Sequence, residues 1–281
     1  MKLKLTRRRF GQLAVASATT AAIGTLANKT FAQTSNLVIY GARPNPQAGI
    51  VVVQSLNVAT REVQEETTAT LEIGEQLTGF TSLADGTLIM VISPIRGGKK
   101  EDSATRLVVL GTSLKTLAVS GLTKQQLLES VLGLNDGSLI GLVVKSNYTP
   151  PVRLVDINLN TGEISFTDKV KLPGQERFSN LCQCTNGTIY TTATAQRGET
   201  SLVQLALAQE QPIIGAQLKF EDTLWNSGLS SLACSPSDQL FALGARRYEA
   251  PYNLYTVNPS NGVMGLLRKW DVLKITIPRP A

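Results

Sequence analysis

Histidine is absent from the 281-residue sequence. This absence excludes Ser-His-Asp and Cys-His catalysis, histidine-ligated zinc and pH switching by histidine. Only three cysteines are present, Cys182, Cys184 and Cys234, too few for a disulfide framework to replace a hydrophobic core. The chain also lacks a G-x-G-x-x-G motif, a P-loop, a G-x-S-x-G motif and an EF-hand loop. We therefore expect no cofactor and no metal site.

Charge is scarce as well, at 17% of residues, whereas apolar residues make up 42%. Such a chain can bury a sizeable core. The net charge of +6 arises in the N-terminal segment: residues 1–32 hold six of the 27 Lys and Arg residues and no acidic residue. The remaining 21 cations balance the 21 anions. A protein without a net basic surface has no general attraction to phosphate backbones, so we expect no nucleic-acid partner.

The N-terminal segment has the layout of an export signal. A basic stretch at residues 6–10, Thr-Arg-Arg-Arg-Phe, precedes a mildly apolar stretch at residues 13–26 and a small-x-small cleavage site at residues 30–32. The apolar stretch is too short and too polar to span a bilayer permanently. With Arg7 and Arg8 as the pair and Phe10 in place, the segment resembles a twin-arginine signal, although Gly11 stands where that signal usually has Leu. The resemblance implies export of the folded protein to a periplasm or thylakoid lumen. An ordinary secretory signal or an uncleaved arm is the alternative.

A repeat of about fifty residues fills the rest of the chain, which has no long stretch of helical periodicity. Its copies are marked by turns at Asp85-Gly86, Asp136-Gly137 and Asn186-Gly187, with a fourth copy, one residue longer, around Asp238. Asp-Gly and Asn-Gly favour two-residue hairpin turns, so each copy predicts two tightly joined strands. A second hairpin follows, seen clearly around Gly162 and Gly262, which lie two periods apart. Four short strands per repeat are typical of a propeller blade.

The chain ends are predicted to complete the ring. The first unit has three strands, at residues 37–42, 50–56 and 62–68, and lacks an innermost one. The segment Val272–Ile277 is left over at the far end and has the pattern of a strand. If it joins the first unit, five complete sheets form without an open edge. We therefore predict a signal peptide at residues 1–32 and an all-β, five-bladed propeller at residues 33–281. A β-sandwich or an incomplete solenoid is the alternative.

One face of this propeller is predicted to carry the longer loops and hence the binding residues. Arg96, Arg197 and Arg247 occupy matching loop positions in three blades, Asn147 takes that position in a fourth, and Tyr248 lies beside Arg247. Arginine suits bidentate contacts with carboxylates or phosphates, so this ring of residues predicts a site for an anionic ligand, a glycan or an acidic partner. The alternative is a solvated face neutralised by its own acidic residues.

The innermost strands are predicted to begin near the central channel with Ser130, Asn180 and Ser230 at matching positions, which we count among the binding candidates. Glu129 and Asp271 lie just before or beside such positions. This architecture resembles five-bladed glycosidases of the arabinanase type, which place a pair of carboxylates there. The resemblance covers architecture alone and implies Glu129 and Asp271 as the candidate catalytic residues.

The cysteines have two interpretations. Cys182 and Cys184 lie two residues apart on one strand, and Cys234 corresponds to Cys184 in the next blade. Leucine holds this position in two earlier blades, which favours buried thiols that pack between blades. A disulfide between Cys184 and Cys234 is the alternative.

The whole chain, signal included, resembles exported propellers of unknown function from the cyanobacterial envelope or lumen. This resemblance implies an accessory role beside an envelope or lumen protein. We expect a non-catalytic binding or scaffolding module that meets the twin-arginine translocase during export and keeps no membrane span after cleavage. A carbohydrate-active hydrolase is the alternative function.

Overall fold

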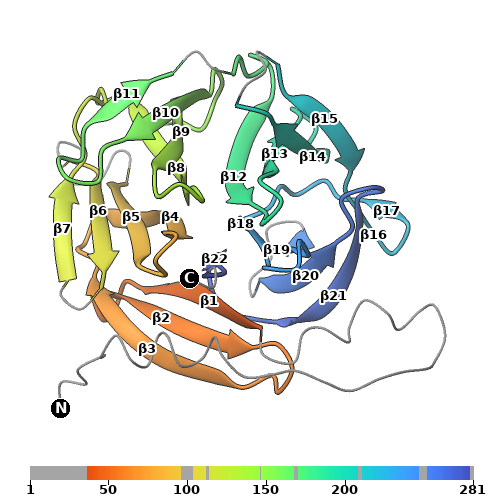
Figure 1. Ribbon diagram of the computed structural model, residues 1–281, viewed down its shortest axis with the longest axis horizontal. Coiled ribbons are helices and arrows are strands. Elements are labelled where there is room, and N and C mark those ends of the chain that lie inside the picture. Colours follow the sequence, from red (N-terminus) through yellow and green to blue (C-terminus); the bar gives the residue numbers. More distant parts are fainter. Residues whose placement is uncertain are drawn as a thin grey trace.

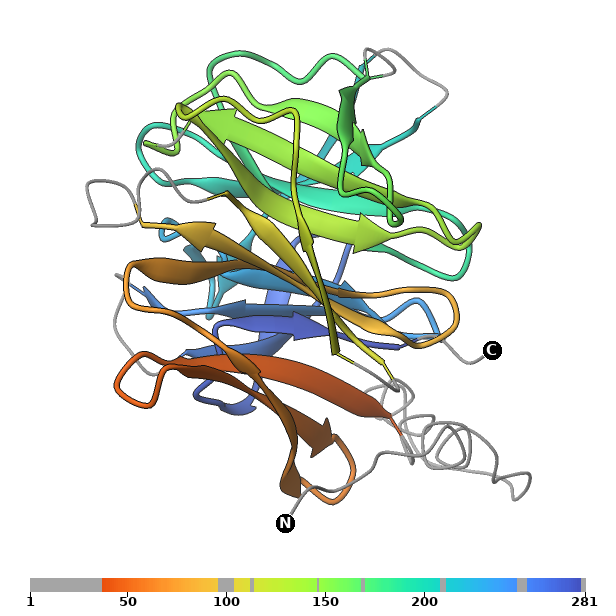
Figure 2. The same cartoon turned by 90° about the vertical axis from the view of Figure 1, so that its left-hand side faces the viewer.

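The protein is a five-bladed β-propeller. The computed structural model describes residues 37–95, 104–111, 114–145, 147–167, 170–207, 211–246 and 252–278. Within these ranges every regular element is a strand, and the strands form five sheets around a central axis (Figure 1). A side view shows the strands running between the two faces of the ring, with the loops gathered at either end (Figure 2). The predicted all-β, five-bladed propeller is confirmed and the β-sandwich alternative is wrong, whereas the predicted signal peptide at residues 1–32 lies outside the described residues.

Several predicted residues lie outside the described ranges. These are Arg7, Arg8, Phe10, Arg96, Arg247 and Tyr248. In the part of the chain that is described, no helix is long and apolar enough to cross a membrane.

Each blade is named here by its order along the chain, and its strands are given from the axis outward. Blade 1 contains β22 (Lys274–Thr276), β1 (Val38–Asn45), β2 (Ile50–Asn57) and β3 (Val63–Thr70). Blade 2 contains β4 (Glu75–Ser82), β5 (Leu88–Pro94), β6 (Arg106–Leu110) and β7 (Leu114–Ala118). Blade 3 contains β8 (Gln126–Gly133), β9 (Leu139–Lys145), β10 (Arg153–Ile157) and β11 (Ile164–Phe166). Blade 4 contains β12 (Arg177–Gln183), β13 (Ile189–Thr194), β14 (Thr200–Leu205) and β15 (Ile213–Gln217). Blade 5 contains β18 (Ser231–Cys234), β19 (Leu240–Gly244), β20 (Asn253–Val257) and β21 (Val263–Lys269).

The two ends of the described chain meet in blade 1. The C-terminal strand β22 pairs antiparallel with β1, with Tyr40 opposite Thr276. Its backbone is also held by blade 5, because Ser231 Oγ accepts a hydrogen bond from the Ile275 N–H at 3.0 Å. The innermost strand of blade 1 therefore comes from the opposite end of the sequence to the other three strands.

Apolar side chains form the seams between blades. Five clusters of buried residues are found, and each combines residues of two neighbouring blades. Alternation along the strands produces this arrangement, because a blade with apolar residues on both faces can bury them only against its neighbours. The largest fully buried side chains include Phe178, Trp225, Phe241 and Tyr255.

The turns differ from the predicted two-residue hairpins. The Gly86 N–H bonds to Leu83 O at 3.0 Å, and Gly86 alone in this turn has a positive φ, of 82°. The loop therefore has three residues, a type I turn closed by a glycine in the left-handed conformation. The Asp85 carboxylate accepts the Thr87 N–H at 2.9 Å instead of adopting positive φ itself. The turns at Gly137 and Gly187 repeat this pattern.

The second hairpin of blades 3 and 5 packs against the preceding blade. Gly162 and Gly262 both have positive φ, and a Cβ on either would lie 2.1 Å from the backbone oxygen of the last residue in the preceding blade's outermost strand, Ala118 of β7 or Gln217 of β15. The connection into blade 5 adds two short strands that the sequence did not predict, β16 (Lys219–Phe220) and β17 (Thr223–Leu224). The first of these pairs in parallel with β21. Glycine is thus required where the turn packs against the preceding blade.

Candidate functional site

A cavity of about 300 Å³ opens at the end of the ring axis where the innermost strands begin. All five blades contribute to its lining. The lining includes the polar and charged side chains of Gln76, Glu129, Tyr148, Arg177, Asn180 and Lys274. The cavity lies on the face with the connections between blades, the face on which the sequence predicted binding residues. Its volume suits a small molecule.

Bulges in the innermost strands turn side chains toward this cavity. The pairing register shifts at Leu77/Gly79 in β4, at Leu128/Ser130 in β8 and at Ser179/Cys182 in β12. Thr78 and Glu129 are the extra residues at the first two shifts, and at the third Asn180 and Leu181 lie opposite the single residue Thr191. Thr78, Glu129 and Asn180 all line the cavity. A bulge redirects a side chain that regular alternation would send into a seam. Asn180 has a φ of 61°, the left-handed conformation that asparagine tolerates better than most residues.

Glu129 and Arg177 form an ion pair beside the cavity, in which the Glu129 side chain is buried and the Arg177 side chain is 42% exposed. Both the Nε and the Nη2 of Arg177 donate to Glu129 Oε1, the first at 3.1 Å. The Arg177 guanidinium also lies over the Tyr148 ring, 4.8 Å from its centroid. Glu129 Oε2 is buried and has no hydrogen-bond partner. A carboxylate that uses one oxygen for both guanidinium contacts leaves its second oxygen without a donor, which costs stability in a folded protein.

Tyr148 completes this side of the cavity. Its hydroxyl donates to Gln76 Oε1 at 3.3 Å and so links blade 3 to blade 2. Burial raises the pKa of Tyr148, and the nearby Glu129 carboxylate raises it further. Tyr148 therefore stays a neutral hydroxyl, with an aromatic face against Arg177.

Lys274, the first residue of β22, supplies a second cation. Its Nζ donates to Ser230 O at 2.8 Å, and its side chain lines the cavity from the axis. Burial lowers the pKa of Lys274 to about 8; the Glu129 carboxylate acts in the opposite direction, and the Arg177 guanidinium lowers the pKa further. The buried ammonium thus has one carboxylate nearby and competes with a guanidinium for it.

The other predicted inner residues have structural partners. Ser130 Oγ accepts the Leu181 N–H at 2.9 Å, and Ser130 does not line the cavity. Asn180 Nδ2 donates to Leu229 O at 2.9 Å, so its amide fastens blade 4 to the chain entering blade 5. Ser230 Oγ donates to Leu273 O, which fixes the residue before Lys274. Asn180 and Ser230 line the cavity while they hold its wall.

The predicted loop residues that are described lie away from the cavity. Arg197 occupies a tight turn closed by the Gly198 N–H to Ala195 O bond at 2.9 Å. Asn147 Oδ1 accepts hydrogen bonds from the Thr149 N–H and hydroxyl within its own loop. Neither residue lines the cavity. The described part of the predicted ring therefore does not converge on one point.

The two candidate carboxylates are not brought together. Glu129 lines the cavity, whereas Asp271 does not, and Asp271 lies at the surface 3.8 Å from Arg43. Among the described residues, Glu129 is the one carboxylate that lines the cavity. Glycoside hydrolysis needs two carboxyl groups on either side of one substrate.

Cys184 and Cys234 form a disulfide between blades 4 and 5 at the face opposite the cavity. The expectation of buried thiols is wrong for this pair, whereas Cys182 is a buried cysteine outside the disulfide. The fourth turn has the same three-residue loop as the others when Ser235, not Cys234, is aligned with Cys184. It is therefore not one residue longer, and Cys234 belongs to the last position of β18.

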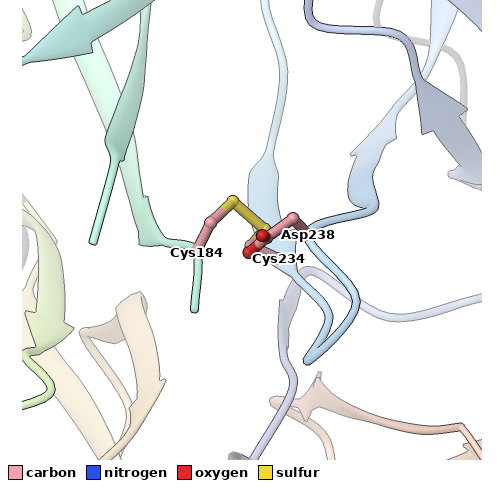
Figure 3. A group of neighbouring side chains, drawn as sticks. All are labelled: Cys184, Cys234 and Asp238. Carbon is pink, nitrogen blue, oxygen red and sulfur yellow. A yellow bond between two sulfur atoms is a disulfide. The ribbon is translucent and has the colours of Figure 1, made fainter. Parts of the chain in front are cut away.

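Asp238 lies beside the disulfide at the same seam (Figure 3) and adds a hydrogen bond across it. It has a φ of 61°, and its Oδ1 accepts the Thr185 N–H of blade 4 at 2.7 Å. One oxygen of Asp238 and the two cysteine sulfurs lie within 4.8 Å of one another. Metals bind thiolates, and the sulfur atoms of a disulfide are not thiolates. The group therefore serves as a link between blades.

No protein-family model matches the chain, and no curated protein matches its sequence. Solved structures resemble its fold. A protein of unknown function from Dyadobacter fermentans is 9% identical, with a TM-score of 0.52 over 83% of this chain and 84% of that one. One from Bacteroides caccae is 11% identical, with a TM-score of 0.49 over 86% and 99%. A gluconolactonase from Xanthomonas campestris is 9% identical, with a TM-score of 0.48 over 84% and 77%. The first of these likenesses shows the propeller fold and no activity.

Sequence reasoning missed the two cations of the cavity. Arg177 begins β12 and Lys274 begins β22, each on an innermost strand. The sequence signal that could have identified both cations was a charged residue at the first position of an innermost strand. The sequence instead predicted the binding charges in the loops, where binding residues commonly gather.

Proposed function

We propose that the protein is an exported, non-catalytic binding propeller and that its ligand is a small organic anion held in the central cavity. The observation that carries this proposal is the charge of the cavity lining: Lys274 and Arg177 against the single carboxylate of Glu129. A bound anion stabilises a cation that is removed from water, because the anion replaces the favourable interaction with water that burial took away.

The remaining lining supports a carboxylate-bearing organic molecule rather than a bare inorganic ion. Leu77, Leu229 and Leu273 offer apolar surface, and Tyr148 offers an aromatic ring. Hydroxyl and amide groups stand between them, including Gln76, Thr78 and Thr194. Ligand pockets commonly combine apolar walls with a few polar groups that fix orientation.

Calorimetric titration of the full chain with acetate, lactate and citrate tests the proposal. We expect at least one carboxylate to bind and Lys274→Met to weaken that binding by about tenfold or more, the worth of one charge-assisted hydrogen bond. Lys115→Met, on the exposed strand β7, is the matched control and should bind as the wild type does. Equal binding by Lys274→Met, or no binding of any of the three anions, contradicts the proposal.

A second substitution tests whether the ligand binds in the cavity or at the predicted ring of loop residues. Arg197→Glu reverses a charge on the same face without touching the cavity lining. The cavity proposal predicts unchanged carboxylate binding by Arg197→Glu. Loss of binding in this variant would favour the loop residues as the ligand site.

The export route is part of the same proposal. Residues 1–32 carry the Arg7-Arg8 pair and no acidic residue, which supports passage of the folded propeller through a twin-arginine translocase into a periplasm or thylakoid lumen. The link between Cys184 and Cys234 fits an oxidising compartment. An envelope or lumen protein as a second partner stays a prediction.

Replacing Arg7 and Arg8 by lysine tests the route. In a bacterial host with a twin-arginine translocase, the double variant should stay in the cytoplasm while the wild type reaches the periplasm. Fractionation followed by immunoblotting measures this. Export of both proteins in a host that lacks the translocase would contradict the proposed route.

A further inference from the structure

Lys274 is held in place more firmly than most lysines. In the pairing of β22 with β1, Lys274 lies opposite Ala42. The Leu273 N–H bonds to Ala42 O at 2.8 Å, and the Ile275 N–H bonds to Ser231 Oγ at 3.0 Å. Hydrogen bonds to blades 1 and 5 thus fix the backbone on both sides of Lys274. A nucleophile positioned in this way reacts without first losing the freedom of a mobile side chain.

The surroundings of Lys274 favour its neutral amine. The ionisable groups that line the cavity with it are Glu129, Arg177, Tyr148 and Tyr252. Among these described groups Glu129 is the one carboxylate, and its Oε1 already accepts hydrogen bonds from Arg177. Burial brings the pKa of Lys274 to about 8, so a substantial fraction is uncharged at mildly alkaline pH. A desolvated lysine beside another cation is the form of lysine that attacks carbonyl carbons.

We propose that the ligand carries an aldehyde or ketone group beside its carboxylate, and that Lys274 Nζ captures this carbonyl as a reversible imine. Arg177 faces the same cavity and provides the charge for the carboxylate. The inference rests on the proposed function, because it names the class of small anion that the same cavity takes.

The chemistry balances without any other reactant. The Nζ lone pair forms a bond to the carbonyl carbon, and the π electrons of the C=O bond move to oxygen. That oxygen takes a proton, and Nζ loses one, which gives a carbinolamine. Loss of the hydroxyl group together with the second proton of Nζ releases one water and leaves the C=N bond. Nothing is oxidised or reduced, and hydrolysis returns both partners unchanged.

Reductive trapping with glyoxylate tests the inference on the full chain. Glyoxylate is a small carboxylate with an aldehyde, and cyanoborohydride converts its imine into a carboxymethyl-lysine. Peptide mapping by mass spectrometry then gives the modified fraction of each lysine. At pH 7 we expect Lys274 to be modified at least about tenfold faster than the exposed Lys115, because much more of its amine is neutral. Excess acetate should slow trapping at Lys274 and leave Lys115 unaffected.

The pH profile separates Lys274 from ordinary lysines. The trapping rate at Lys274 should rise up to about pH 8 and then level off, whereas the rate at the lysine of a model peptide should still rise above pH 9. A profile at Lys274 parallel to that of the model peptide, or equal rates at Lys274 and Lys115 at pH 7, overturns the inference.

Acetate binding by the wild type, measured by calorimetry, distinguishes failure of the inference from failure of the proposed function. If the wild type binds acetate but Lys274 is not preferentially trapped, imine capture is wrong and anion binding stands. If neither glyoxylate nor acetate occupies the cavity, the proposed function is wrong as well.

Discussion

At the scale of single residues, the role proposed for Lys274 comes with a cost in stability. Its pKa of about 8 in the folded protein lies below the value of 10.5 for a free lysine. Below pH 8 the folded and unfolded chains both carry the charge, and only the folded chain keeps it away from water. Ionisable groups with strongly shifted pKa values are common at functional sites, where a group that destabilises the fold can be kept because it is needed for function.

The free energy of unfolding should depend on pH through Lys274. Between pH 8 and 10.5 the folded protein loses this proton and the unfolded chain keeps it, so the unfolded state binds more protons and stability rises with pH. At pH 7 Lys274→Met should be more stable than the wild type by roughly 1–3 kcal/mol, a range reduced for the partial exposure of the side chain to the cavity.

Urea denaturation at pH 7 and pH 9.5 measures this difference. The gap between Lys274→Met and the wild type should narrow at the higher pH, and Lys115→Met should show no gap at either pH. A gap that widens with pH, or a destabilised Lys274→Met at pH 7, would show that the ammonium is satisfied in the folded protein.

At the scale of elements, the seam between blades 4 and 5 is reinforced in two ways. The disulfide joins residues 50 apart in sequence, and Asp238 bonds across the same seam. The innermost strands β12 and β18 run from this link to the cavity, where Ser179 and Ser230 line opposite sides of the seam. A covalent link at one end of two packed strands limits how far the cavity end can open.

Removal of the disulfide should destabilise the propeller by up to about 4 kcal/mol, the chain-entropy value for a loop of this length. Denaturation of the wild type with and without a phosphine reductant measures the loss. The Cys184→Ser, Cys234→Ser double variant should resemble the reduced wild type and be insensitive to the reductant. An oxidised wild type no more stable than the double variant would contradict a structural role for the bond.

Sequence patterns predicted the elements better than they predicted the site. Alternating apolar residues and repeated turns located the blades, because burial between blades imposes the period of two on every strand. Strands β16 and β17 have two residues each and therefore no periodicity to detect. The disulfide was the alternative and not the preferred interpretation, because leucine at the corresponding position of two earlier blades favoured buried thiols. Matching positions in the repeat placed Glu129, Asn180 and Ser230 near the central channel, and all three line the cavity. The bulges that turn Glu129 and Asn180 inward have no sequence signature, so the rest of the lining could not be derived.

At the scale of the whole molecule, the ring places residues distant in sequence around one axis. Glu129 lies on blade 3, Arg177 on blade 4 and Lys274 on the innermost strand of blade 1. Each blade supplies a few side chains, and the rigid seams fix their spacing. Such a scaffold preorganises a small binding site without a helix or a mobile lid among the described residues.

A crystal structure of the full chain with bound glyoxylate, trapped by cyanoborohydride, tests the central claim most directly. The claim is that the cavity at the ring axis holds a small carboxylate between Lys274 and Arg177. We predict continuous density from Lys274 Nζ to a carboxylate within hydrogen-bond distance of the Arg177 guanidinium. An unmodified Lys274 in an empty cavity, with adducts only on surface lysines, would contradict the account.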